Sequence, residues 1–264
     1  MRINLRNNLA GNAPDDDFQP YLDTFLLPGC STPLGGVLIV PGGGYAIRGD
    51  YEGDAVAAKF NSLGYHAFVL QYRVSPNRFP APQQDLVRAV KIIRANAEAW
   101  RLNKLAVLGF SAGAHLAASG AMLSEKFAVN EGDEADKFPG TVDALVLCYP
   151  VISLTASFAH GSSGENLFGP ETPAEVKARL NMNELVDSST PPSFLWHTAD
   201  DDAVSVYNSL EFAQKMWQCG NSCELHVFPH GYHGRGLGYG TADLKQWTDL
   251  CAVFLETSAG FTRG

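Results

Sequence analysis

One short motif carries the residue types of a nucleophilic enzyme. Gly109-Phe-Ser-Ala-Gly113 matches the pattern G-x-S-x-G, in which a serine sits on a sharp turn between a strand and a helix. The motif alone is weak evidence, because Thr257-Ser-Ala-Gly260 nearly matches it as well. Its context is stronger, since the apolar run Leu105–Leu108 precedes it and small, helix-compatible residues follow it. We therefore expect Ser111 to act as a nucleophile that attacks a carbonyl carbon.

The serine motif lies within a repeating alternation of apolar runs and amphipathic stretches. Six runs have the length and composition of buried strands, at residues 36–40, 66–70, 105–108, 144–148, 193–196 and 224–228. Apolar residues at helical spacing lie between and after them, as in Val56, Phe60 and Leu63. This pattern predicts an α/β fold with a mainly parallel sheet and helices on both faces. We expect residues 1–264 to form one such domain.

A serine nucleophile needs a base, and the base needs a carboxylate to orient it. A serine on a strand-to-helix turn is typical of the α/β-hydrolase fold, in which the chain order is serine, acid, histidine. His233 lies in the loop after the last expected strand and is the favoured base, with His230 as the alternative. The run Asp200–Asp202 follows the fifth expected strand, and spacing alone does not choose among its carboxylates. His115, one turn beyond the serine, is expected to be a packed structural residue.

A glycine run is the expected source of the oxyanion hole. Pro41-Gly-Gly-Gly-Tyr45 follows the first expected strand, where backbone N–H groups can face the developing negative charge. Glycines let the backbone approach a substrate without an intervening Cβ atom. A phosphate-binding loop is the rival interpretation, but neither G-x-G-x-x-G nor G-K-[ST] continues from this run, and Pro41 removes one donor.

These pieces together resemble the esterase branch of the α/β-hydrolases. They are most similar to the acetyl-xylan/feruloyl esterase-like carbohydrate esterases, and more loosely similar to the hormone-sensitive-lipase-like enzymes. The matching segments keep the family's order over about residues 37–234: Val40–Tyr45, Tyr72–Pro76, Phe79–Pro82, Gly109–Gly113, Tyr149-Pro150, His197–Asp201 with Val204, and Phe228–Gly234.

The resemblance also assigns roles to particular residues. The family pattern D-x-x-V falls on Asp201 and Val204, and the family favours His233 over His230. It thus implies a catalytic triad of Ser111, Asp201 and His233. It further implies that the oxyanion donors are the N–H groups of Gly43, Gly44 and Ala112.

The alternation of strands and helices fails between Pro150 and Pro191. This polar stretch, with one helix expected near residues 173–180, predicts a lid-like or substrate-binding insertion at 151–190. It holds few bulky apolar residues, which favours short acyl groups over long chains. Three aromatic residues adjoin the expected catalytic elements and offer faces for a sugar ring: Tyr45, Phe110 and Tyr232.

Composition narrows the classes of partner. The 264 residues are 45% hydrophobic and 18% charged, with a net charge of −9, which disfavours nucleic acid and anionic membranes. No run is long enough to span a membrane, and Met1–Asp17 lacks the apolar core of a signal peptide, so we expect a cytoplasmic protein. The five cysteines favour free thiols. No ligand pair suggests a metal, and we expect no cofactor; whether the chain forms a homo-oligomer stays open.

The sequence therefore predicts a serine hydrolase that acts on small-molecule esters. It is expected to cleave short-chain carboxylic esters through an acyl-enzyme and to deacetylate sugars or oligosaccharides. Three alternatives remain: a generic carboxylesterase, an aminopeptidase of the prolyl oligopeptidase type, and a non-catalytic α/β-hydrolase binding module. The aminopeptidases carry a propeller domain, for which this chain has no room, or an acidic clamp. A binding module would be marked by loss of a triad residue, and all three are present.

Overall fold

An eight-stranded sheet organises the part of the chain that the computed structural model describes, residues 1–6, 12–14 and 16–264. The strand order is β1-β2-β4-β3-β5-β6-β7-β8. In that order the strands are Arg2–Asn4, Tyr21–Phe25, His66–Gln71, Leu34–Val40, Leu102–Phe110, Ala144–Cys148, Ser193–Thr198 and Cys223–Phe228. The strands from β4 to β8 pair in parallel, whereas β2 is antiparallel to both β1 and β4.

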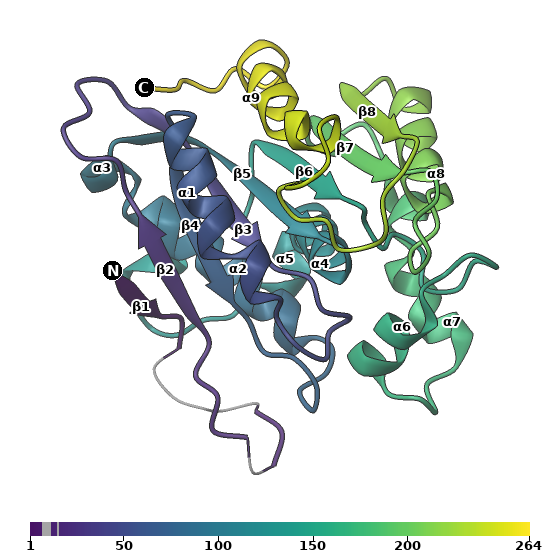
Figure 1. Cartoon of the computed structure of the whole chain (residues 1–264). Coiled ribbons are helices and arrows are strands. Elements are labelled where there is room, and N and C mark those ends of the chain that lie inside the picture. The colour runs from purple at the N-terminus through teal and green to yellow at the C-terminus, as the bar shows by residue number, and fades with distance from the viewer. Residues whose placement is uncertain (7–11, 15) are drawn as a thin grey trace.

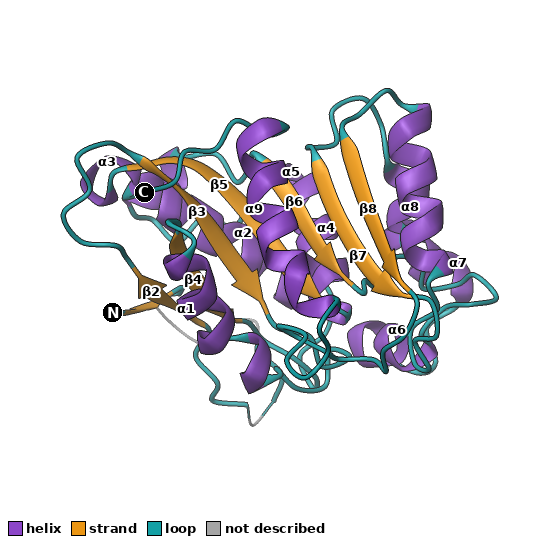
Figure 2. Ribbon diagram, turned by 45° about the horizontal axis from the view of Figure 1, so that its top comes forward, coloured by secondary structure: helices purple, strands orange, loops and turns teal. Residues whose placement is uncertain are grey.

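Helices cover both faces of this sheet, as Figures 1 and 2 show. Because side chains alternate along a strand, Val37 and Ile39 of β3 join a core with α1 (Asp54–Ser62) and α9 (Trp247–Thr257). Leu38 and Val40 face the other core, with helices α2 (Ala81–Ala95), α4 (Ala112–Met122) and α8 (Tyr207–Gln218). A strand buried on both faces is mostly apolar, and every residue of β3, β6 and β7 is buried, including the polar Ser193, His197 and Thr198 of β7.

Short helices complete the connections. The α-helices among them are α3 (Ala97–Trp100), α5 (Ser124–Phe127), α6 (Gly161–Phe168) and α7 (Ala174–Lys177). The 3₁₀ helices are η1 (Asp50–Glu52), η2 (Glu134–Lys137), η3 (Ala178–Leu180), η4 (Met182–Leu185) and η5 (Leu244–Gln246).

The predicted α/β-hydrolase fold is confirmed, and each of the six expected strands is present. Strands β1 and β2 were not predicted. The five residues of β2 are alternately half-buried and buried at one end of the sheet, and a short, partly polar run gives little signal. The helix expected near 173–180 is present as α7 and η3, while α6 was missed because it starts with Gly161-Ser-Ser-Gly164, residues of low helix propensity.

The parallel ladder continues past the strand ends into the loops that follow. The N–H of Ser111, after β5, donates to the carbonyl of Cys148 at 3.0 Å. Likewise the N–H of Tyr149 donates to Trp196 at 2.7 Å, and that of Ala199 to Phe228 at 2.8 Å. The loops that follow β5, β6 and β7 are thus fixed to their neighbours at the carboxyl edge of the sheet.

Two further observations concern the described residues as a whole. No helix among them has the length and apolar content to cross a membrane. The five cysteines all lie in described ranges and are unpaired, as expected: Cys30, Cys148, Cys219, Cys223 and Cys251.

Candidate active site

Ser111 lies at the turn between β5 and α4, with φ 52° and ψ −121°. This left-handed φ is unusual for a residue with a side chain, and strain of this kind concentrates at functional sites. A Cβ atom on Gly113 would lie 2.3 Å from the carbonyl oxygen of Val40, so α4 can pack against the end of β3 only with glycine there. The local sequence therefore builds the strained turn that the motif predicts.

Three side chains from three separate loops form one hydrogen-bonded chain. The Oγ atom of Ser111 lies 2.8 Å from Nε2 of His233, and Nδ1 of His233 lies 2.7 Å from Oδ2 of Asp201. A carboxylate only accepts, so Nδ1 carries the proton and Nε2 is free to accept from the serine hydroxyl. This is the arrangement that a general base requires.

Asp201 is held by more than the histidine. Its Oδ1 accepts from the N–H groups of Ala203 at 3.0 Å and Val204 at 2.8 Å, which gives a physical reason for the D-x-x-V spacing. Its Oδ2 also lies 3.3 Å from Nε2 of His197. Burial alone raises the pKa of the Asp201 carboxyl, but the hydrogen bonds from His197, His233 and Val204 outweigh it and hold that pKa well below its usual range. The carboxylate therefore stays ionised.

The neighbouring acids and the alternative histidine lie elsewhere. His230 is exposed, and its Nδ1 lies 3.0 Å from Oδ2 of Asp200, which is itself half exposed. The loop after β8 that carries His233, residues 229–243, is called the histidine loop here. The Oδ1 atom of Asp202 accepts from the backbone N–H of His233 in this loop, at 3.3 Å, and not from its imidazole. The structure thus joins Asp201, and neither neighbouring acid, to the imidazole beside Ser111.

Three backbone N–H groups near the serine have no hydrogen-bond partner in the described part of the chain: those of Gly43, Gly44 and Ala112. Gly43 has φ +122°, a conformation that side chains rarely adopt, and its carbonyl accepts from the N–H of Ala46 at 3.0 Å. The Gly43 carbonyl therefore faces into the turn, and the N–H groups of Gly43 and Gly44 are available to a bound substrate. Free donors beside a serine suit an oxyanion hole.

Two of the three expected sugar-binding aromatics do not fit that role. Tyr45 is 1% exposed, and its hydroxyl donates to Nδ1 of His115 at 2.7 Å. Phe110 is fully buried against Tyr149 and Trp247. Each adjoins a catalytic element in sequence, but its side chain points into a core, so neither ring face can meet a sugar.

Tyr232 differs from the other two. It is 64% exposed, and the guanidinium of Arg235 lies 4.4 Å from its ring centroid. Its role in substrate binding stays a prediction.

His115 is the packed structural residue that the sequence predicts. Its Nε2–H donates to the carbonyl of Leu180 at 2.9 Å, and its Nδ1 accepts from Tyr45. Both ring nitrogens are satisfied in a fully buried position, and burial lowers the pKa of His115 to about 4.

The insertion at 151–190 brings polar side chains beside the glycine run Pro41–Tyr45, which we call the oxyanion loop. The Nδ2 atom of Asn166, in α6, donates to the carbonyl of Gly44 at 2.9 Å, and Ser163 Oγ lies 4.0 Å from where a Cβ atom of Gly44 would be. His160 precedes α6; burial lowers its pKa, with His233 lowering it further and Asp201 raising it. Figure 2 shows α6 beyond the ends toward which β7 and β8 point. A lid-like role stays a prediction.

Two buried residues at the site escaped the sequence interpretation. Glu52 is 1% exposed, and its carboxylate accepts from the N–H of Gly42 at 2.7 Å and from the hydroxyl of Tyr149 at 2.5 Å. No spacing rule links Glu52 to the serine motif, and Tyr149 stood out only as part of the family pattern. Folding alone brings them together.

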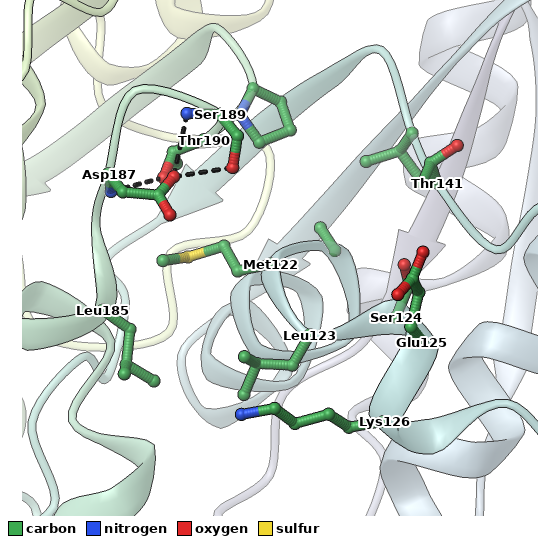
Figure 3. Close-up of a pocket in the computed structure, with 13 residues that line it drawn as sticks. Met122, Leu123, Ser124, Glu125, Lys126, Thr141, Leu185, Asp187, Ser189 and Thr190 are labelled. Carbon is green, nitrogen blue, oxygen red and sulfur yellow. Dashed lines mark hydrogen bonds between the residues drawn. The ribbon is translucent and has the colours of Figure 1, made fainter.

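A pocket of about 380 Å³ lies at the opposite end of α4 from Ser111 (Figure 3). Met122, Lys126, Leu185 and Thr190 are among its lining residues. Because α4 starts at the serine and runs away from the carboxyl edge, this pocket is separate from the hydrogen-bonded chain. Within the described ranges, no group of three His, Cys, Asp or Glu residues is placed to hold a metal ion.

The chain is similar to known proteins over most of its length. The family model described as BD-FAE matches residues 22–216. The crystal structure of an acetyl ester-xyloside bifunctional hydrolase from Caldicellulosiruptor lactoaceticus is 38% identical in sequence. Its TM-score is 0.91, and the match covers 99% of this chain and 97% of that one.

Two curated relatives are longer proteins, and this chain matches only part of each. Acetylxylan esterase of Xylanibacter ruminicola is 29% identical over 78% of this chain and 42% of its own length. Endo-1,4-beta-xylanase B of Butyrivibrio fibrisolvens is 35% identical over 75% of this chain and 32% of its own length. The chain thus spans about a third to two fifths of these relatives.

Proposed function

This chain belongs to the BD-FAE family of α/β-hydrolase esterases, and we propose that it hydrolyses short-chain carboxylic esters with Ser111 as nucleophile. The observation that carries the proposal is the unbroken hydrogen-bonded chain from Ser111 through His233 to Asp201. Free N–H groups beside the serine support it, because acyl transfer needs donors where negative charge develops.

In the first step Ser111 Oγ attacks the ester carbonyl carbon, and its proton passes to Nε2 of His233. The carbonyl oxygen gains the negative charge and accepts from the three free N–H groups. Asp201 keeps its hydrogen bond to Nδ1 and stabilises the imidazolium by its opposite charge. The low pKa of the Asp201 carboxyl suits this role, since the proton stays on the imidazole.

Collapse of the tetrahedral intermediate breaks the ester C–O bond, and His233 gives its proton to the leaving alcohol oxygen. Water then attacks the acyl-enzyme while His233 takes one of its protons. The second tetrahedral intermediate then collapses: the bond between the acyl carbon and Ser111 Oγ breaks, His233 returns its proton to Oγ, and the carboxylic acid leaves. Apart from the substrate and one water molecule, the proposed steps use only this chain's own side chains and backbone.

We further propose that the acyl group is short, acetyl above all, and that the alcohol is a sugar hydroxyl. Two of the similar proteins, an acetylxylan esterase and an acetyl ester-xyloside bifunctional hydrolase, support this class. Ser163 and Asn166 support it as well, because polar side chains beside Gly44 offer little to a long alkyl chain. The exposed ring of Tyr232, one residue from the base, is suited to stack on a sugar.

The test is a series of p-nitrophenyl esters of increasing acyl length, together with acetate release from acetylated xylo-oligosaccharides. Acetyl and propionyl esters should exceed octanoyl esters in kcat/KM by about tenfold or more, since each mismatched methylene costs binding energy. A preference for octanoyl esters would reject the short acyl site. Absence of acetate release would leave a generic carboxylesterase, and cleavage of amino-acid p-nitroanilides would favour the aminopeptidase.

The single domain over 1–264 and the cytoplasmic location stay predictions from the sequence.

A further inference from the structure

The carboxylate of Glu52 sits where the oxyanion loop and the histidine loop meet. Its Oε2 accepts from the N–H of Gly42, immediately before two of the free donors, and its Oε1 accepts from the hydroxyl of Tyr149. Glu52 is nonetheless 1% exposed, and an acid that is almost never fully buried without partners calls for a reason.

Tyr149 extends this contact to the histidine loop. Its hydroxyl oxygen accepts from the N–H of Gly236 at 2.8 Å. Its ring meets the imidazole of His233 edge-on, with centroids 5.1 Å apart and planes at 74°. Because Gly236 supplies its own proton to that bond, the tyrosine proton is available for Glu52. One carboxylate therefore holds two loops, directly in one case and through a single tyrosine in the other.

The charge of Glu52 follows from counting donors. Gly42 and Tyr149 each donate a hydrogen bond to it, so the ionised form satisfies both bonds with no carboxyl proton of its own. Burial raises the pKa of Glu52 above its usual value, and the bonds from Tyr149 and Gly42 and the nearby charge of His233 offset only part of that rise.

We propose that Glu52 is a positioning residue: a buried carboxylate that holds the oxyanion loop and, through Tyr149, the histidine loop at a fixed spacing around Ser111. Neither of its hydrogen-bond partners, Gly42 and Tyr149, is a member of the hydrogen-bonded chain from Ser111 to Asp201. Glu52 acts on the two groups whose placement governs the reaction, the N–H donors and the base. The inference rests on the proposed serine mechanism.

The ionisable groups near Glu52 decide what else changes when its charge is removed. Tyr51, Tyr72, Tyr149 and Cys148 interact electrostatically with Glu52. All four are neutral near pH 7, because burial raises their pKa values. His233 also faces Asp201 and His160. Glu52→Gln therefore changes the charge of the network while it leaves these neutral neighbours and Asp201 in place.

The experiment compares Glu52→Gln and Tyr149→Phe with a matched control. Glutamine keeps the size but places an NH₂ donor against another donor, and phenylalanine keeps the ring but removes the bond between the loops. The control is Tyr65→Phe, a fully buried tyrosine on the same face of the sheet whose hydroxyl donates to the Ala252 carbonyl at 3.2 Å. Active sites are counted by reaction with a fluorophosphonate, so that kcat refers to folded enzyme.

Glu52→Gln should lower kcat about 10- to 100-fold, as expected for losing hydrogen bonds to a charged group, with KM changed less than about threefold. Tyr149→Phe should lower kcat in the same direction, and Tyr65→Phe should leave kcat unchanged. Folded variants with parental kcat would overturn the inference. If Glu52→Gln does not fold, Tyr149→Phe decides alone. Loss of Ser111 dependence in the parent would instead overturn the mechanism itself.

Discussion

His197 places its Nε2 atom 3.3 Å from Oδ2 of Asp201, the same oxygen that lies 2.7 Å from Nδ1 of His233. The Nε2–H of His197 also donates to the carbonyl of Val204 at 2.8 Å, and its Nδ1 accepts from Ser209 at 2.8 Å. This fully buried histidine thus stands beside the acid without being able to reach the serine. It explains why Asp201, among three adjacent carboxylates, is so firmly fixed.

The first prediction separates these carboxylates. Asp201→Asn should lower kcat by roughly 10³- to 10⁴-fold, because an amide favours the wrong tautomer of His233. Asp200→Asn and Asp202→Asn, which meet His230 and a backbone N–H respectively, serve as controls and should each change kcat less than about tenfold. Steady-state rates on p-nitrophenyl acetate measure all three. A larger loss at Asp202 than at Asp201 would reassign the acid.

The second prediction concerns the nucleophile. Ser111→Ala should lower kcat by on the order of 10⁶-fold while leaving the fold intact, with residual rate from the oxyanion donors. Mass spectrometry after fluorophosphonate treatment should find the label on Ser111 alone. Ser258, in the near-match to the motif, is the internal control. Label on Ser258, or an active alanine variant, would contradict the assignment.

The third prediction links stability to pH through His115. Burial lowers its pKa in the folded protein to about 4, against about 6.5 when unfolded. Between these values the unfolded chain binds a proton that the folded chain does not, so stability falls as pH drops from about 6.5 to about 4. The full effect is about 3 kcal/mol. The free energy of unfolding of the parent should therefore fall more steeply over this window than that of His115→Gln. Parallel curves would show that His115 is not the group responsible.

The fourth prediction distinguishes the exposed aromatic from a buried one. Tyr232→Ala should raise KM for acetylated xylo-oligosaccharides by roughly 2- to 10-fold, the loss expected for one stacked ring. KM for p-nitrophenyl acetate, which has no sugar, should not change. Tyr45→Phe should leave both KM values unchanged but lower stability by about 1–3 kcal/mol, because it leaves the buried Nδ1 of His115 without a donor. Equal KM values in Tyr232→Ala and the parent would exclude stacking on that ring.

The sequence located those features that depend on local chain geometry. Ser111 was expected because its turn needs glycine on both sides, whereas spacing left Asp200–Asp202 open and only the family pattern D-x-x-V favoured Asp201, whose carboxylate accepts from the N–H of Val204. Tyr45 and Phe110 were misplaced because adjacency in sequence does not fix the direction of a side chain. Phe110 comes directly before the serine, yet its ring enters the core beneath α9.

Glu52 lay beyond sequence reasoning for a different reason. Its partners are 10 residues away at Gly42 and 97 residues away at Tyr149, and no local pattern requires either contact. A charged residue in a polar stretch is usually exposed. Only the packed structure shows that this one is enclosed.

Because the hydrogen-bond ladder runs past the strand ends, the register of the strands fixes the spacing of the reacting groups. Ser111, Tyr149 and the Asp201 loop follow three adjacent strands, each tied to the next by one further N–H to carbonyl bond. Sliding one strand by a single residue would move its loop about 3.3 Å, whereas errors near 1 Å already slow such reactions. The displacement that the reaction tolerates is therefore smaller than the smallest shift in register between neighbouring strands. Insertions at the amino edge should leave catalysis untouched, while any slip between β5 and β8 should abolish it outright rather than weaken it by degrees.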